Sequence, residues 1–275
     1  MEKLKAALDK ARAAREQTAS TTGQARSEGR AGGGPALSSE AWEAIAPIGS
    51  EPRSAARRKL PVLSGGAEAT PFDVLRTKVL QLTGSHGWRR VAITSPLPGS
   101  GKTTMAANLA LALARHGDLR VILFDLDMRR PGLAKLLDAP EGASMSEVLE
   151  GQVDFASQAR RIGENLVVSM NHLSLRDSAD LLLRKSTRAA LDDIERRYQP
   201  DIMLFDLPPM LVGDETQAFS SCVDCAILVA EGSVSTIPQI DLCEKDLAEQ
   251  TNVLGVVLNK CRFASEDSGY YYDYS

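Results

Sequence analysis

The sequence lacks several features that mark particular classes of protein. Its 275 residues include only four cysteines, which is too few for a disulfide framework in a chain of this length. No apolar segment approaches the roughly 20 residues that span a bilayer, and the opening Met-Glu-Lys-Leu-Lys lacks the apolar stretch of a signal peptide. The net charge of −4 gives no basic excess for binding nucleic acid. We therefore expect a cytoplasmic protein without a membrane span or a nucleic-acid partner.

The cysteines do not form a recognisable metal or redox site. Cys222 and Cys225 stand in a C-x-x-C arrangement, but they lead directly into the apolar run 226–230. No second pair accompanies them, and no histidine lies nearby in the sequence. Buried apolar cysteines beside a strand are the favoured interpretation.

Aromatic residues are also scarce, at 5% of the chain, and the tyrosines are unevenly placed. Four of the five tyrosines lie in the last six positions, at Tyr270, Tyr271, Tyr272 and Tyr274. This segment has neither helical nor strand periodicity, and chain ends are usually mobile. A tyrosine-rich end makes little sense as core, so we interpret it as a substrate.

The most informative segment is 95–104, which reads Ser-Pro-Leu-Pro-Gly-Ser-Gly-Lys-Thr-Thr. It follows an apolar run and precedes a helical pattern, which is the strand, glycine loop and helix order of a phosphate-binding loop. In such a loop, backbone N–H groups and the helix N-terminus bind phosphate oxygens. Lys102 would reach the terminal phosphates, and the Thr103 hydroxyl would bind Mg²⁺. Because Pro96 replaces the first glycine, this is a variant Walker A motif.

The remaining apolar runs predict the fold. They alternate with helical stretches, which is typical of a mostly parallel sheet with helices on both faces. We expect an α/β P-loop NTPase domain whose ligands bind at the carboxyl ends of the strands. The expected strands are 90–94, 121–124, 166–169, 202–205, 226–229 and 253–258. The expected helices include one that opens at Pro71 and Phe72 and is ended by the segment 84–87, and others over 104–116, 178–198 and 237–250.

The N-terminal region differs in composition from the rest. Residues 1–18 have helical spacing with lysines and arginines around a mostly alanine face, and 18–34 is rich in Ala, Gly, Ser and Thr. A frayed, solvated helix is favoured over a lipid-binding or partner-binding one. We divide the chain into a flexible N-terminal extension (1–65), a P-loop domain (66–263) and a tyrosine-rich tail (264–275).

Carboxylates follow two of the expected strands. Asp125 and Asp127 follow one strand, and Asp206 follows another. An aspartate at a strand end beside a P-loop commonly holds the Mg²⁺ of a nucleotide, so Asp206 is the Walker B candidate. The second acidic element offers a further carboxylate that could accept a proton from an attacking hydroxyl, which suits phosphoryl transfer to a protein side chain. Arg129 or its neighbour Arg130 would steady the transferred charge or bind the acceptor, unless it only pairs with a surface acid.

Together these motifs resemble the bacterial tyrosine kinases (BY-kinases) of polysaccharide export, of the CpsD/CapB type. The resemblance covers about residues 70–275 and implies a fold related to MinD and ParA. It further implies ATP and Mg²⁺ as cofactors, self-association, and autophosphorylation of the tail in trans, which regulates capsule or exopolysaccharide synthesis. A transmembrane polysaccharide co-polymerase would activate the protein at the inner face of the membrane, and a tyrosine phosphatase would reset it.

The resemblance also assigns roles by motif position. Which of Asp125 and Asp127 is the base stays open, and Asn259 is equally well explained as a turn residue at a strand end. The implied catalytic residues are Lys102, Asp125, Asp127 and Arg129. The implied ATP-binding residues are Pro98, Gly99, Ser100, Gly101, Lys102, Thr103, Thr104 and Asn259. The implied Mg²⁺ ligands are Thr103, Asp127 and Asp206, and the implied phosphorylation sites are Tyr270, Tyr271, Tyr272 and Tyr274.

The sequence departs from this family at one motif. Members usually carry Glu-x-x-Arg-x-x-Arg before the first strand for contacts between subunits, and the matching positions here are Thr70, Asp73 and Arg76. The departure puts the family's ring contact in doubt. The alternative function is a MinD/ParA-type ATPase switch. That class has a signature lysine early in its P-loop, whereas 95–98 reads Ser-Pro-Leu-Pro.

Overall fold

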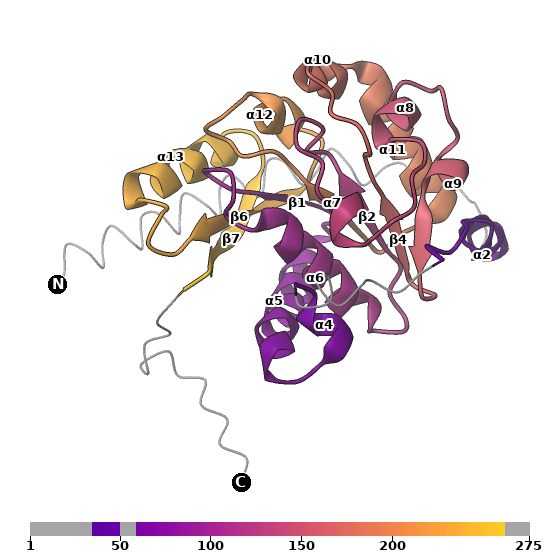
Figure 1. The fold of residues 1–275 in the computed structure, drawn as a ribbon, viewed down its shortest axis with the longest axis horizontal. Helices are drawn as coiled ribbons and strands as arrows, with labels where there is room; N and C mark the ends of the chain where they lie inside the picture. Colours follow the sequence, from indigo (N-terminus) through magenta and orange to yellow (C-terminus); the bar gives the residue numbers. More distant parts are fainter. Residues whose placement is uncertain (1–34, 50–58, 262–275) are drawn as a thin grey trace, which may run out of the picture.

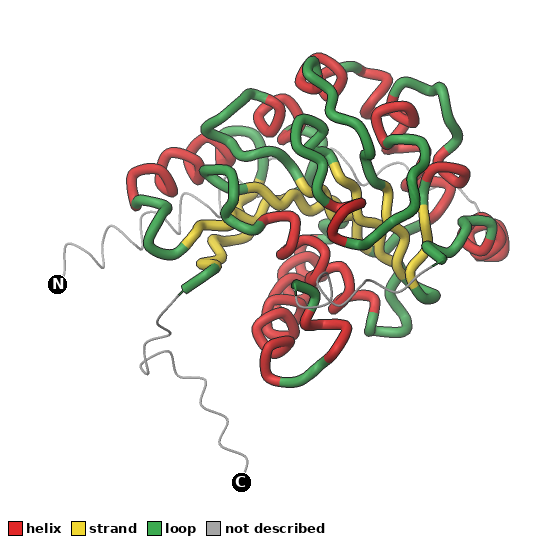
Figure 2. The backbone as a smooth tube through the Cα atoms, in the orientation of Figure 1, coloured by secondary structure: helices red, strands yellow, loops and turns green. Residues whose placement is uncertain are grey.

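The computed structural model describes residues 35–49 and 59–261. Over these residues a seven-stranded sheet carries helices on both faces (Figures 1 and 2). The strands are β1 (Arg90–Thr94), β2 (Val121–Asp125), β3 (Arg160–Ile162), β4 (Leu166–Ser169), β5 (Ile202–Asp206), β6 (Cys225–Glu231) and β7 (Asn252–Asn259). The longer helices are α2 (Pro35–Glu43), α5 (Thr70–His86), α6 (Lys102–Ala114), α11 (Lys185–Tyr198) and α13 (Ile237–Ala248). The shorter ones are α4 (Pro61–Ser64), η2 (Ala67–Ala69), α7 (Leu133–Leu136), α8 (Met145–Leu149), α9 (Phe155–Gln158), α10 (Ser178–Leu183) and α12 (Glu215–Ser220).

The strand order is β3-β4-β2-β5-β1-β6-β7, and all neighbours are parallel except β3 and β4. This confirms the expected mostly parallel α/β sheet. Every residue of β1, β2, β4 and β5 is buried, which explains why these strands read as continuous apolar runs. The order places β2, β5 and β1 side by side at the centre, so the two acidic strand ends lie beside the strand that enters the P-loop.

Two apolar cores lie on the two faces of the sheet. Successive strand residues point to opposite faces, so Phe124 packs in one core and Leu123 in the other. Helices α8, α11, α12 and α13 cover the first face, and α4, α5 and α6 cover the second (Figure 1). In the first core the rings of Phe124 and Phe205 stack with centroids 4.9 Å apart. None of the helices in the described ranges has the length and apolar character needed to cross a bilayer.

The expected start of the P-loop domain at residue 66 differs from the structure, in which residues before this position pack into the cores of the domain. Trp42 and Ile45 are buried in the first core, and the Trp42 indole donates to the Glu164 carbonyl at 2.7 Å. Leu60 and Val62 are buried in the second core. These segments are short and carry few apolar residues each, so periodicity alone cannot separate them from a linker. Residues 1–34 and 50–58, which complete the expected extension, lie outside the described residues.

Local differences from the expected elements have simple causes. The helix expected over 178–198 is two helices, α10 and α11, because Arg184 between them has an extended backbone with ψ of 140°. Strand β3 was not expected, since it has three half-buried residues and little apolar pattern.

Cys222 and Cys225 are buried as expected, and burial raises the pKa of the Cys225 thiol. Within the described ranges, no group of three or more His, Cys, Asp and Glu side chains is arranged to hold a metal ion by itself.

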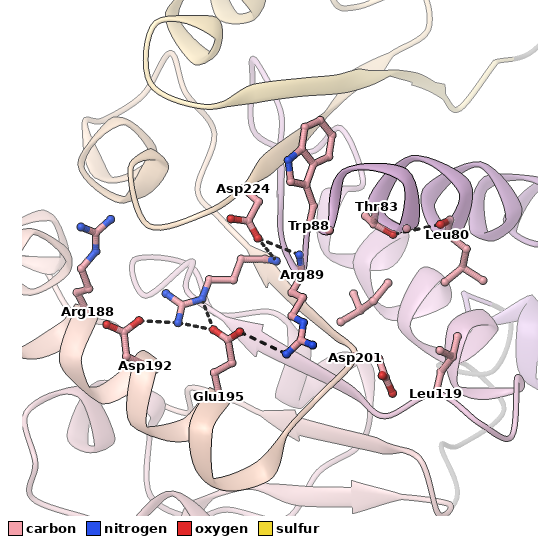
Figure 3. A pocket seen from close by; sticks show the side chains of 14 residues that line it. Leu80, Thr83, Trp88, Arg89, Leu119, Arg188, Asp192, Glu195, Asp201 and Asp224 are labelled. Atoms are coloured by element: carbon pink, nitrogen blue, oxygen red, sulfur yellow. Dashed lines mark hydrogen bonds and ion pairs between the residues drawn. The ribbon is translucent and has the colours of Figure 1, made fainter. Parts of the chain in front are cut away.

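A cavity of about 1110 Å³ lies at the amino ends of the strands, on the opposite edge from the P-loop (Figure 3). The buried Arg90 guanidinium crosses it and donates to Asp192 at 2.6 Å and to Glu195 at 2.6 and 2.9 Å. Asp224 accepts the backbone N–H groups of Arg89 and Arg90, both at 2.9 Å. The charged groups of this cavity thus hold the start of β1 to α11 and to the start of β6.

Arg90→Met is expected to lower the free energy of unfolding by about 2–3 kcal/mol, because it removes the cation of Asp192 and the nearer cation of Glu195, which keeps only Arg89 at 3.9 Å. The estimate lies below the range for fully buried pairs because the Asp192 side chain is 58% exposed. Urea unfolding checks it. Arg196→Met is the control, because Arg196 pairs with Asp193 in solvent, and its loss should cost less than about 0.5 kcal/mol. Equal effects of the two substitutions would contradict this account of the cavity.

Candidate active site

The P-loop connects β1 to α6 as a tight turn with two left-handed residues. Gly99 has φ of 84° and Gly101 has φ of 87°, a region that glycine adopts without strain. The hydroxyls of Ser95 and Ser100 both donate to the Leu97 carbonyl at 2.9 Å. These bonds fix the loop internally, so the N–H groups that precede α6 have a defined direction.

The end of β7 holds the P-loop from outside. The Asn259 amide donates to the Ser100 carbonyl at 2.8 Å, and the Lys260 ammonium donates to the Gly99 carbonyl at 2.6 Å. Lys260 also forms an ion pair with Glu231 at 3.2 Å. Asn259 therefore lies against the loop, and its role in adenine binding stays a prediction. Sequence reasoning missed Lys260, although it directly follows Asn259.

Gly101→Ala is expected to weaken ATP·Mg²⁺ binding at least about tenfold. A Cβ at Gly101 would lie 2.3 Å from the Asn259 amide nitrogen, and the φ of +87° adds strain for any other residue. Titration with a fluorescent ATP analogue measures the affinity. Gly163→Ala is the matched control, because Gly163 also has positive φ but no atom within 4 Å of an added Cβ. An unchanged affinity in Gly101→Ala would contradict the close fit of loop and Asn259.

Three aspartates meet around Lys102 at the carboxyl end of the sheet. Asp125 and Asp206 are register partners on the adjacent strands β2 and β5. The Lys102 ammonium lies 2.6 Å from Asp127 Oδ2 and 3.6 Å from Asp206 Oδ1. The structure therefore brings together the four charged residues that the sequence assigned to one site.

Burial makes this cluster electrostatically strained. Both oxygens of Asp206 and Oδ1 of Asp125 are buried without a hydrogen-bond partner among the described residues. Burial raises the pKa of Asp206, against the charge of Lys102 and the neighbouring Thr103 hydroxyl. Burial and then the charge of Asp206 raise the pKa of Asp125 well above its ordinary value. Burial lowers the pKa of Lys102, but the charges of Asp206 and Asp127 outweigh it, so that pKa is raised.

The two aspartates that follow β2 have different surroundings. Asp125 Oδ2 accepts the backbone N–H groups of Gly132 at 3.3 Å and Leu133 at 3.1 Å. Its backbone carbonyl accepts the Asn171 amide at 2.6 Å, a contact that sequence reasoning missed. Asp127, in contrast, lines a small surface cavity of about 60 Å³ with Arg129, Arg130 and other residues. Asp125 thus shapes the loop from inside, whereas Asp127 is also buried, at 4% exposure, but lines this cavity.

The arginines after Asp127 are both near the site. Arg129 forms an ion pair with Glu215, and the backbone N–H of Arg130 donates to Asp127 Oδ1 at 3.1 Å. Arg129 thus pairs with an acid, but this acid is 1% exposed and is not the surface acid of the alternative interpretation. At the positions where the sequence departs from the family's Glu-x-x-Arg-x-x-Arg motif, Arg76 forms an ion pair with Asp73 of the same helix at 3.1 Å. The four terminal tyrosines lie outside the described residues.

The donor set fits a magnesium ion. Mg²⁺ prefers carboxylate, hydroxyl and water oxygens, and phosphate oxygens complete its shell in nucleotide sites. The two oxygens of Asp206 and Oδ1 of Asp125, which accept no hydrogen bond within the described part of the chain, and the hydroxyl of Thr103 at the start of α6 offer such ligands. A cation there would also relieve the repulsion among the buried carboxylates.

Comparisons with known proteins agree with this geometry. Residues 91–270 match the profile of the CobQ/CobB/MinD/ParA nucleotide binding domain. The chain is 28% identical over 204 residues to the tyrosine-protein kinase YwqD of Bacillus subtilis, covering 73% of this chain and 84% of the relative. It is 23% identical over 203 residues to a putative tyrosine-protein kinase CapB of Staphylococcus aureus, covering 73% and 88%.

Solved structures of similar fold include a tyrosine kinase domain and an ATP-binding synthase. The kinase domain of the Escherichia coli tyrosine kinase ETK superposes with a TM-score of 0.68 and 25% identity, over 78% of this chain and 84% of that domain. A cobyrinic acid a,c-diamide synthase of Mycobacterium smegmatis, solved with an ATP analog and magnesium, has a TM-score of 0.53 and 22% identity. That alignment covers 62% of this chain and 74% of the synthase, and at this identity it shows the shared fold alone.

Proposed function

Because this chain belongs to the CobQ/CobB/MinD/ParA nucleotide binding domain family, we propose that its P-loop serves an ATP-dependent protein-tyrosine kinase. The resemblance to bacterial tyrosine kinases is confirmed by relatives that carry this name and by the ETK kinase domain. The acceptor is the chain's own cluster, Tyr270, Tyr271, Tyr272 and Tyr274. The observation that carries the proposal is the group of three carboxylates around Lys102. Two carboxylates suffice for a metal site, so the third is available to accept the proton of the tyrosine hydroxyl.

The cofactors of this reaction are ATP and Mg²⁺. Loop 98–104 and Asn259 would hold the nucleotide. Thr103 and Asp206 would hold the metal, with Asp125 in place of the expected Asp127, because Asp127 Oδ2 already pairs with Lys102 at 2.6 Å. When bound, Mg²⁺ neutralises charge on the phosphate oxygens. The buried oxygens of Asp206, which accept no hydrogen bond from the described residues, support this assignment.

The protein's own groups divide the remaining work. The Lys102 ammonium stabilises negative charge on the transferred phosphoryl group, and Arg129 does so from the acceptor side. We assign the base to Asp127, because it lines the cavity of about 60 Å³ and its side chain is 6% exposed, whereas Asp125 is fully buried. The tyrosine hydroxyl gives its proton to Asp127 as its oxygen bonds to the γ-phosphorus. The bond from that phosphorus to the β–γ bridging oxygen breaks, and ADP leaves.

The biological setting is proposed from the relatives. The chain would phosphorylate the tail of a second copy in trans and thereby regulate capsule or exopolysaccharide synthesis and export. A transmembrane polysaccharide co-polymerase would recruit it to the inner face of the membrane and activate it, and a tyrosine phosphatase would reverse the modification. The similarity to CapB supports this setting.

Partition of the γ-phosphate separates the kinase from the alternative ATPase switch. Purified protein, together with the cytosolic segment of a co-polymerase and ATP·Mg²⁺ labelled in the γ-phosphate, should place label on protein faster than it releases free phosphate. A switch ATPase would release free phosphate and leave the protein unlabelled, and that result would reject the kinase.

A further inference from the structure

One buried acid near the site has no place in the reaction described above. The Glu215 side chain, at the start of α12, is 1% exposed. It forms an ion pair with Arg129 Nε, and its Oε1 also accepts the Ser178 hydroxyl at 3.0 Å. Ser178 begins α10 and is itself buried. A buried carboxylate is costly unless it is paired and hydrogen-bonded, and this one has both kinds of partner.

The ion pair joins the acidic loop to the neighbouring helices. Arg129 lies two residues after Asp127, and both line the cavity of about 60 Å³ together with Glu215. The Arg129 side chain is 44% exposed, so without a partner it would be free to sample many rotamers in solvent. Glu215 engages Nε, the inner nitrogen of the guanidinium, and the rest of the group borders the cavity.

The backbone beside Glu215 is built for a close approach. A Cβ at Gly213 would lie 2.2 Å from Glu215 Oε2, so only glycine leaves room for the carboxylate in this position. Ser178 holds one oxygen of Glu215 and the gap at Gly213 accommodates the other. The Ser178 hydroxyl therefore holds the carboxylate in place, in a space that the missing side chain of Gly213 leaves open.

We propose that Glu215 is a positioning residue that fixes the Arg129 guanidinium beside Asp127 for phosphoryl transfer. The inference rests on the proposed kinase function and adds a residue to it. Groups stabilise the charge of a transition state best when they are already oriented, because reorienting them during the reaction costs part of the free energy that they contribute. Glu215 acts through Arg129 and reaches neither nucleotide nor acceptor in this role.

A spectroscopic measurement tests the contact without any turnover. The Arg129 Nε–H signal in ¹⁵N-labelled full-length protein is assigned by its loss in Arg129→Lys. We expect a shifted, slowly exchanging signal in the wild type that moves to the free-arginine position in Glu215→Gln. Ser178→Ala keeps the carboxylate but removes its hydroxyl support, and it should move the signal part of the way. An unchanged signal in Glu215→Gln would overturn the proposal.

A double-mutant cycle then tests the catalytic consequence. Glu215→Gln should lower the rate constant of tail phosphorylation by about 10–100-fold, with KM for ATP within about twofold of the wild type. In an Arg129→Met background the same substitution should have almost no further effect, because its target is absent. Equal losses in both backgrounds would assign Glu215 a merely structural role and overturn the proposal.

The matched control is Glu195→Gln, which removes another glutamate that pairs with an arginine, at the opposite edge of the sheet. It should lower stability and leave the rate constant of tail phosphorylation near the wild-type value. If the wild type does not phosphorylate tyrosine at all, the proposed kinase function fails. The Nε signal still decides in that case whether Glu215 positions Arg129.

Discussion

Lys102→Met is expected to lower the rate of tyrosine phosphorylation by at least about 10²–10³-fold. The ammonium is buried among three carboxylates at the mouth of the P-loop, where it is the cation that can stabilise charge on the transferred group. The same substitution removes the charge that pairs Asp127 and Asp206. We therefore expect a second effect, a loss of about 3 kcal/mol in the free energy of unfolding.

Two measurements separate these effects. Transfer of labelled phosphate to the protein gives the rate, and urea unfolding gives the stability. Lys245→Met is the control, since Lys245 is an exposed residue of α13, and it should change neither quantity measurably. A Lys102→Met protein that keeps its stability would show that the carboxylate cluster does not depend on this ammonium. One that keeps its transfer rate would show that the P-loop lysine is not catalytic.

Asp206→Asn is expected to lose nearly all activity. In the absence of nucleotide and metal, however, the variant should be more stable than the wild type. Asp206 has two buried oxygens without a hydrogen-bond partner among the described residues and lies beside Asp125 in the sheet. An uncharged amide of the same shape removes like-charge repulsion and can donate to a neighbouring carboxylate. We expect a gain of about 1–2 kcal/mol, against a loss of about 10²–10³-fold in phosphorylation rate.

The sign of the pH dependence follows from the raised pKa of Asp206. A carboxyl group with a higher pKa in the folded state binds more protons there, so ionisation lowers the free energy of unfolding as pH rises. The stability of Asp206→Asn relative to wild type should therefore be near zero below about pH 4 and should increase as pH rises through the folded-state pKa. Urea unfolding at a series of pH values with EDTA measures this difference. A wild type more stable than Asp206→Asn at neutral pH would contradict it.

The signals that predicted that Lys102 and the three aspartates lie together are local, and the structure does bring them together. Gly99 and Gly101 mark a turn that needs positive φ, and each aspartate directly follows a continuous apolar strand. In a parallel sheet those strand ends share one edge, so the meeting of Asp125 and Asp206 follows from topology alone. The chemistry of the site was thus readable from short segments, although the roles of its residues stay predictions.

The parts that sequence reasoning missed depend on contacts between distant segments. Glu215 lies 86 residues from Arg129, and Asn171 reaches the Asp125 carbonyl across 46 residues. Nothing in the residues around them marks a partner. Trp42 fills the first core from a short segment of mixed composition, so burial could not be inferred from periodicity. Tertiary packing determines these contacts, and a single sequence does not encode it in a local pattern.

The most direct test of the central claim is a phosphotyrosine map. Full-length protein, alone and with the cytosolic segment of a co-polymerase, is incubated with ATP·Mg²⁺ and analysed by mass spectrometry, with Lys102→Met in parallel. The account predicts phosphate on one or more of Tyr270, Tyr271, Tyr272 and Tyr274 in the wild type and none in the variant. A wild-type tail without phosphate under both conditions would contradict it.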